Sequence, residues 1–227
     1  MRVAIVGHGP SMKGAGLGPE IEAHDRIVRL KQGWMMPQVR PDDYGSRLDI
    51  ICSTLKTWRP YWKLPIKEYW GYQSFPGQDA SLGKIREHFG SIPVHLAGAA
   101  ISRWLGEYRE LADIRGGWER PSDGMTKVGD EPWFSTGMGA IVMACALLLP
   151  ETVTLFGFDN LVQGRREEFT NIFRTTDHEY PRHAWNIEWR MLQLLEKEYN
   201  VRIDSKPIPR TSTCDGAGTS VGYAAAG

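Results

Sequence analysis

The residues that follow the first apolar segment could bind a phosphate through their backbone. Val3–Val6 runs directly into a loop that has glycines at positions 7, 9 and 14. A buried strand that ends in a glycine-rich loop, with a helix behind it, is the arrangement that α/β proteins use to hold a nucleotide. Glycine-rich turns also follow many strands for steric reasons alone, so a ligand site here needs support from later segments.

One such segment is Phe134-Ser-Thr-Gly-Met-Gly139, which precedes a mostly apolar run. The more common use of Ser135 or Thr136 at this position is to cap the helix that begins there. The alternative is functional, because free N–H groups, two hydroxyls and the positive end of a helix would together attract an anion. The segment therefore predicts a helix start, with an anion site as its functional interpretation.

A second segment carries two histidines, His178 and His183, in a polar loop directly ahead of an amphipathic stretch. A histidine is more often structural than catalytic, but the positive end of a helix favours a neutral imidazole that can accept a proton. Glu188 lies five residues after His183, about 140° around a helix that turns about 100° per residue. If both residues belong to the helix they do not face each other, so we expect a structural or supporting role for Glu188.

The composition excludes several classes of function. The chain has 227 residues, which is long enough for one α/β domain with a full core. Lys+Arg and Asp+Glu both number 27, so no net charge attracts nucleic acid. The sequence contains no His-Glu-x-x-His, paired Cys-x-x-Cys or Asp-x-Asp pattern, and we therefore expect no metal site.

Cysteine usage and hydropathy predict a cytoplasmic protein. An odd, sparse set of cysteines, Cys52, Cys145 and Cys214, is typical of free thiols in a reducing compartment. The longest apolar stretch, Gly137–Leu149, is shorter than a membrane span. The N-terminal residues lack the flanks of a signal peptide. We therefore expect no integral membrane segment.

Short apolar segments alternate with helical patterns along the chain. This alternation predicts a Rossmann-like α/β fold, with a mostly parallel sheet covered by helices on both faces, in a single domain over residues 1–210. Residues 211–227 lack periodicity and are expected to be disordered. Most aromatic side chains between Trp58 and Phe75 are expected in the core, with one or two at an acceptor pocket. The expected strands are Val3–Val6, Arg26–Leu30, Leu48–Cys52, Ile92–Leu96, Val153–Phe156 and Val201–Asp204, and the expected helices are Gly16–Ala23, Ala99–Glu110, Thr136–Leu149 and Ala184–Tyr199.

The same segments resemble the motifs of a known family. Ala4–Ile21 with His24–Arg29 resembles the large sialyl motif of the eukaryotic-type sialyltransferases. The segment that begins with Phe134-Ser-Thr-Gly137 and ends with Glu151–Phe158 resembles their small motif. His178-Glu-Tyr180 is similar to the third motif, and His183 with Glu188 matches the very small motif. Each motif is loose alone, but the four together, in the family's order, are specific.

The resemblance implies a sialyltransferase-type fold and an inverting, metal-independent reaction. A sugar acid would pass from a CMP-activated donor to a hydroxyl of a glycan acceptor, with no cofactor besides this donor substrate. The family pattern makes His183 the general base and His178 the group that stabilises the departing phosphate. It places the CMP donor at Gly7, His8, Gly9, Pro10, Ser11, Arg29, Lys31, Ser135, Thr136, Gly137, Gly157, Phe158 and Asp159. From its position at a strand end alone, Asp159 would more commonly cap or brace a loop.

The chain departs from the family at several positions. His8 stands where the family has an asparagine, and a second expected asparagine falls near Lys31. Val3 and Pro150 replace the two cysteines of the family's disulfide. We also expect no counterpart of the family's membrane anchor and stem. These differences fit a cytoplasmic, bacterial, viral or algal relative, and they leave both CMP-sialic acid and CMP-Kdo open as donors.

Two other classes stay open. Gly7-x-Gly9 superficially suits a dinucleotide-dependent oxidoreductase, although Met12 replaces the third glycine and the second expected strand ends without an acidic residue. The chain could also be a degenerate transferase that only binds a sugar or a partner. Retention of both histidines and of Ser-Thr-Gly137 favours the enzyme.

Overall fold

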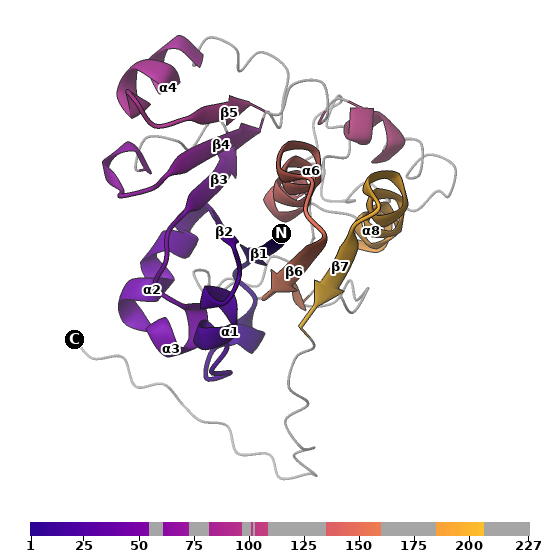
Figure 1. The fold of residues 1–227 in the computed structure, drawn as a ribbon, viewed down its shortest axis with the longest axis horizontal. Coiled ribbons are helices and arrows are strands. Elements are labelled where there is room, and N and C mark those ends of the chain that lie inside the picture. The colour runs from indigo at the N-terminus through magenta and orange to yellow at the C-terminus, as the bar shows by residue number, and fades with distance from the viewer. Residues whose placement is uncertain are drawn as a thin grey trace, which may run out of the picture.

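The fold is built on a seven-stranded parallel sheet. The computed structural model describes residues 1–54, 61–72, 82–96, 101, 103–108, 135–159 and 185–206. The strands are β1 (Arg2–Val6), β2 (Arg26–Leu30), β3 (Ile50–Thr54), β4 (Glu68–Tyr72), β5 (Val94–Leu96), β6 (Thr152–Phe156) and β7 (Arg202–Ser205). Their order across the sheet is β5-β4-β3-β2-β1-β6-β7, and each neighbouring pair is parallel (Figure 1).

The strand order places a topological switch point between β1 and β6. From β1 the chain builds outward through β2 to β5, and it then returns to add β6 and β7 on the other side of β1. In open parallel sheets, ligands bind outside the carboxyl ends of the strands at such a point. The loops that follow β1 and β6 are therefore the ones that would face a ligand.

Helices cover both faces of the sheet (Figure 1). On one face, α6 (Thr136–Leu148) and α8 (Trp185–Tyr199) pack on Val3, Ile5 and Val28. On the other face, α1 (Gly18–Glu22) and α3 (Pro41–Tyr44) cover β1 and β2, and α4 (Leu82–Phe89) covers β3 to β5. The turns η2 (Lys31–Met35) and α2 (Met36–Val39) connect β2 to α3. Two single turns, η1 (Pro10–Met12) and η3 (Tyr61–Lys63), lie among these elements, and residues 101 and 103–108 are helical as well.

Burial explains why these sequences form their elements. Val3 to Val6 are all buried because β1 is central and covered on both faces, which is why it reads as a continuous apolar run. Residues 136–145 of α6 are buried all round, as expected of an apolar helix in the core. In α8, Met191, Leu192 and Leu195 face the sheet, while Lys197 and Glu198 are exposed.

The predicted fold class is confirmed, and the parallel sheet has helices on both faces as expected. β3 begins two residues later than predicted. The sequence reading missed β4, α4 and the short helical turns between Lys31 and Tyr44. The aromatic side chains of Tyr61, Tyr69 and Trp70 are buried in the core, as predicted. The expected disordered tail, 211–227, lies outside the described residues.

Two of the three cysteines lie in described parts of the chain. Cys52 and Cys145 are buried and form no disulfide, as predicted, and burial raises the pKa of each thiol to about 12. Cys214 lies outside the described residues. Within the parts of the chain that the structure covers, every helix is too short or too polar to span a bilayer.

Candidate functional site

The loop after β1 is hydrogen-bonded to the loop after β6. The N–H of Gly7 donates to the carbonyl of Phe156 at 2.7 Å, and the N–H of Gly9 donates to the carbonyl of Gly157 at 2.9 Å. Ser11 donates its N–H to the carboxylate of Asp159 at 2.9 Å, and its hydroxyl donates to the same carboxylate. The two loops thus continue the pairing of β1 with β6 beyond the ends of the strands, and Asp159 braces the loop.

Glycine is required here because two backbones approach closely. A Cβ on Gly7 would lie 2.6 Å from the carbonyl oxygen of Gly157, and one on Gly9 would lie 2.5 Å from the carboxylate of Asp159. Gly157 itself has φ of 67°, and its Cβ would lie 2.7 Å from Met12. These close contacts support a steric reason for the glycines. In addition, the N–H groups of Gly7, Gly9 and Ser11 already donate to acceptors within the protein.

Gly7→Ala is expected to destabilise the fold by roughly 1–3 kcal/mol, because the new methyl group meets a backbone oxygen that cannot move without the strand. The matched control is Gly83→Ala on α4, where a Cβ meets nothing within 4 Å and alanine suits a helix better than glycine. Urea unfolding monitored by circular dichroism measures both. Equal stability of the Gly7→Ala variant and the wild-type chain would contradict the close approach.

The N-terminus of α6 joins this cluster through Phe158. A Cβ on Gly137 would lie 2.6 Å from the ring of Phe158, and a Cβ on Gly7 would lie 3.2 Å from the same ring. The ring therefore packs between two glycines that are 130 positions apart in the chain (137 − 7). The structure thus brings together the segments singled out in the sequence around positions 7–11, 135–137 and 157–159.

Ser135 is the N-cap of α6, one of the two residues predicted for this role. Its hydroxyl oxygen accepts a hydrogen bond from the N–H of Met138 at 3.0 Å. The same residue also holds a carboxylate, because its N–H and its hydroxyl both donate to Glu188, the latter at 2.8 Å. Part of the anion-binding capacity at this helix end is therefore used by the protein's own Glu188.

Glu188 lies in the first turn of α8 and is fully buried. Burial raises the pKa of its carboxyl group to about 7, although the two hydrogen bonds from Ser135 favour the ionised form. The expected structural or supporting role agrees with this contact. The sequence gave no indication of the partner, because Ser135 and Glu188 are 53 residues apart.

A second set of candidate residues lies beside β2. The ring Nε2 of His8 is 2.7 Å from the carbonyl oxygen of Leu30. A carbonyl only accepts, so Nε2 carries the proton, and burial lowers the pKa of His8 to about 4. Lys31 follows directly, with φ of 41°, and a Cβ on Gly33 would lie 3.1 Å from the His8 ring. His8 is therefore a neutral, oriented imidazole at physiological pH.

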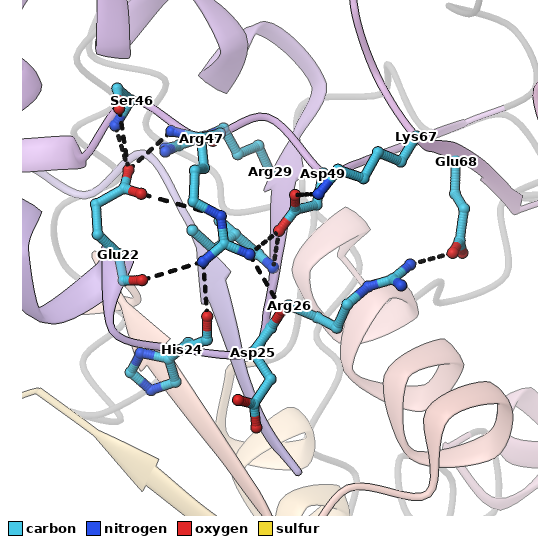
Figure 2. A network of polar contacts seen from close by, with 11 residues as sticks. Glu22, His24, Asp25, Arg26, Arg29, Ser46, Arg47, Asp49, Lys67 and Glu68 are labelled. Atoms are coloured by element: carbon cyan, nitrogen blue, oxygen red, sulfur yellow. Dashed lines mark hydrogen bonds and ion pairs between the residues drawn. The ribbon is translucent and has the colours of Figure 1, made fainter.

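Arg29 is not brought into this cluster. Its Nε donates to the carbonyl of Arg47 at 2.8 Å, and its two terminal nitrogens have no hydrogen-bond partner among the described residues. The side chain is fully buried, and this burial lowers its pKa to about 10. The guanidinium turns toward a polar network on the α1–α3 side of the sheet (Figure 2).

That network is centred on Arg47 and lies near the amino ends of β2, β3 and β4. Arg47 donates to the carbonyls of Glu22, His24 and Asp25 and, at 2.6 Å, to the carboxylate of Asp49 (Figure 2). Lys67 is 2.8 Å from the other Asp49 oxygen. The network lies at the amino ends of the strands, opposite the loops that follow β1 and β6. We therefore interpret it as stabilising the fold and not as part of the candidate site.

Sequence reasoning missed Asp43, which fixes the rest of the glycine loop. Its carboxylate accepts from the N–H of Gly14 at 2.8 Å and from the N–H of Gly16 at 3.0 Å. Both glycines have positive φ, with values of 77° and 64°. No local pattern reveals this contact, because the partners are 29 and 27 residues away.

Some predicted site residues are not covered by the structure. His178 and His183 lie outside the described residues, and of Pro10 only the backbone is described. Among the described side chains, no three of His, Cys, Asp or Glu gather as metal ligands would. The predicted roles of these histidines and the predicted absence of a metal therefore stay predictions.

The comparisons with known proteins find similar solved structures but no matching family model or curated protein sequence. The fold is similar to the crystal structure of a mammalian sialyltransferase, with a TM-score of 0.55 and 16% identity over 89% of this chain and 68% of that chain. A mammalian sialyltransferase in complex with Gal-beta-1-3GalNAc-ortho-nitrophenol matches with a TM-score of 0.48 and 17% identity over the same shares. At 16% identity, the similarity to the first of these two structures shows a shared fold.

Proposed function

We propose that this chain is a glycosyltransferase that transfers a sugar acid from a CMP-activated donor to a hydroxyl of an acceptor sugar. The donor is CMP-sialic acid or CMP-Kdo, the anomeric centre is inverted, and no metal takes part. The ordered sequence motifs support this proposal, and so does the fold shared with a mammalian sialyltransferase.

One observation carries the proposal. Three motif segments, the first of them more than a hundred residues of sequence before the other two, meet at the carboxyl edge of the sheet beside its switch point. They are joined by the bonds of Gly7 and Gly9 to the β6 loop and by the ring of Phe158 against Gly137. This is the edge at which doubly wound folds bind ligands.

In the proposed reaction, His183 removes the proton of the acceptor hydroxyl as its oxygen forms a bond to the anomeric carbon. The bond from the anomeric carbon to the phosphate oxygen breaks, and CMP leaves with the electron pair. His178 stabilises the charge on the departing phosphate, with N–H groups at the start of α6. Since Ser135 gives its N–H to Glu188, an amide further along the first turn of α6, that of Gly137, is the candidate.

The described residues disfavour the oxidoreductase alternative. A dinucleotide site places an acidic residue after its second strand, where it binds the ribose. Here β2 ends at Leu30 and is followed by Lys31. Met12, at the position of the third glycine, is fully buried and fills the space beside Gly157.

Calorimetric titration with CMP and with NADH tests the proposed ligand class, and we expect binding of CMP alone. Turnover of CMP-sialic acid and CMP-Kdo, measured with and without EDTA, then separates an enzyme from a binding module and tests metal independence. Binding of NADH without CMP would contradict the proposal. CMP binding without turnover of either donor would support the degenerate binding module instead.

A further inference from the structure

A groove of about 440 Å³ lies on the α1 side of β6 and β7. The opposite side of these strands is apolar, because Val153, Leu155 and Ile203 pack there in the core with α6 and α8. Among the described residues, α1 is the one helix that contributes to the groove, through Glu20. Most of the lining is polar, and it includes Arg2, Thr152, Thr154, Arg202, Asp204 and Lys206.

Two arginines and a threonine form one row across this groove. β1, β6 and β7 lie side by side in the sheet (Figure 1), and their registers place Arg2 beside Thr152 and Thr152 beside Arg202. Residues in register on neighbouring parallel strands point to the same face, and all three line the groove. Neighbouring strands are about 4.8 Å apart, so the two arginine Cα atoms are about 10 Å apart. An oxyanion above Thr152 is therefore within reach of both guanidinium groups.

Both guanidinium groups are held by the protein and retain further donors. Arg2 donates a terminal N–H to the carbonyl of Ala23, and Nε of Arg202 donates to the carboxylate of Asp204 at 3.0 Å. Among the described residues neither guanidinium makes another hydrogen bond, although an arginine has five N–H donors. The carboxylate of Asp25 binds the backbone N–H of Arg2, at 2.7 Å. The two side chains are therefore oriented before a ligand arrives, which lowers the entropy lost on binding.

The groove carries more positive than negative charge. Its cations are Arg2, Arg202 and Lys206, and its carboxylates are those of Glu20 and Asp204. Glu20 pairs with Lys206, and Asp204 pairs with Arg202. Within the part of the chain that the structure describes, the Arg2 guanidinium has no carboxylate at ion-pair distance. An anion beside Arg2 would complete the pairing of charges in the groove.

The groove beyond the two arginines offers hydrogen-bond acceptors. Nδ1 of His24 is 2.9 Å from the carbonyl oxygen of Glu20, so Nδ1 carries a proton. In the neutral ring Nε2 accepts from the hydroxyl of Thr154 at 3.0 Å, which leaves the lone pairs of that hydroxyl for another donor. The Asp204 carboxylate is an acceptor as well. Since a phosphate group fills only a small part of 440 Å³, the groove suits a larger ligand that also carries hydroxyl donors.

We propose that this groove binds a phosphorylated sugar or polyol, with its phosphate between Arg2 and Arg202 above Thr152 and its hydroxyl groups against Thr154 and Asp204. The planar guanidinium fork matches the oxygens of a phosphate, which supports this choice of anion. Arg2, Thr152 and Arg202 are the first residues of their strands, so the phosphate position lies at the amino edge of the sheet. The proposed donor site lies at the carboxyl edge, and the inference does not depend on it.

Calorimetric titration of the full chain with glucose 6-phosphate and with glucose tests the ligand class. We expect the phosphate ester to bind at least about 10-fold more tightly than glucose, because both arginines contact the phosphate. The titrations are made at low ionic strength, because the Arg202 side chain is 71% exposed and salt would screen the contact.

Three variants locate the phosphate. Arg202→Gln should weaken glucose 6-phosphate binding by about 10-fold, and Arg202→Lys, which keeps the charge, should weaken it less. Thr152→Val removes only the hydroxyl and keeps the branched shape, and we expect a loss of roughly 5-fold. Arg86→Gln, an exposed arginine on α4, is the matched control and should bind like the wild-type chain.

The affinity for CMP distinguishes this groove from the carboxyl edge. It should be the same in Arg202→Gln, Thr152→Val and the wild-type chain. Equal affinity of the wild-type chain for glucose and its phosphate, no binding of the ester at millimolar concentration, or an unchanged affinity in Arg202→Gln would each overturn the inference and leave the proposed function in place. Binding of the ester as expected, without binding of CMP, would contradict the proposed function and support the inference.

Discussion

Glu188→Gln is expected to remove a contribution to stability that falls between pH 5 and pH 8. The folded pKa of Glu188 is raised from 4.5 to about 7, so the folded chain binds this proton more tightly than the unfolded chain. The resulting stabilisation is fully present below pH 4.5 and is lost as pH rises through about 7. The contribution of Glu188 to the stability of the wild-type chain therefore falls by roughly 2–3 kcal/mol between pH 5 and pH 8. His8, whose folded pKa of about 4 lies below its usual 6.5, contributes in the opposite direction in both the wild-type chain and the variant.

Glutamine has no such proton to lose. It can still accept from the N–H of Ser135, but it replaces the second accepted bond with an amide that donates, at a cost of about 1 kcal/mol at either pH. Relative to the wild-type chain, the variant should therefore be slightly less stable at pH 5 and more stable at pH 8. Urea unfolding at the two pH values measures the difference.

Glu87→Gln is the matched control for this variant, because Glu87 is exposed on α4. It should unfold with the pH dependence of the wild-type chain. If Glu188→Gln retains that pH dependence too, the buried carboxyl group is not the one that titrates between pH 5 and pH 8.

His183→Ala is expected to lower the rate of sugar transfer by about 10²–10⁴-fold, the usual contribution of a general base. CMP should bind as it does to the wild-type chain, because the base acts on the acceptor hydroxyl and not on the nucleotide. The measurement pairs a transfer assay, using whichever CMP-sugar proves to be the donor, with calorimetric titration of CMP.

His88→Ala, which removes an exposed imidazole from α4, controls for the loss of a histidine as such. We expect it to transfer at the wild-type rate. Transfer by His183→Ala within a few-fold of wild type would refute the assignment of the base. Loss of CMP affinity together with transfer would give His183 a role in holding the donor instead.

Local patterns were enough to predict the frame of the candidate site. The apolar run of β1, the capped start of α6 and the buried strand β6 each depend on neighbours a few residues away. Since the carboxyl ends of parallel strands share one edge, the convergence of their loops followed from the predicted fold. Ser135 was predicted as a cap for the same reason, and its bond to Met138 confirms this.

Contacts between distant residues could not be predicted in this way. The bond of Glu188 to Ser135 and that of Asp43 to Gly14 depend on how α8 and α3 pack, which no short window of sequence encodes. The direction of Arg29 is similar, because a long side chain on a strand can turn toward either edge of the sheet. The turns between Lys31 and Tyr44 were missed because such short helices have too few residues for a periodic pattern.

The hydrogen bonds that shape the rim of the site are all internal to the chain. Gly7, Gly9 and Ser11 are held by the β6 loop, and Gly14 and Gly16 are held by Asp43. The entropy lost in ordering this rim is therefore lost when the chain folds, and not when a ligand arrives. A nucleotide would meet a preorganised surface, and more of the free energy of its own contacts would appear as affinity.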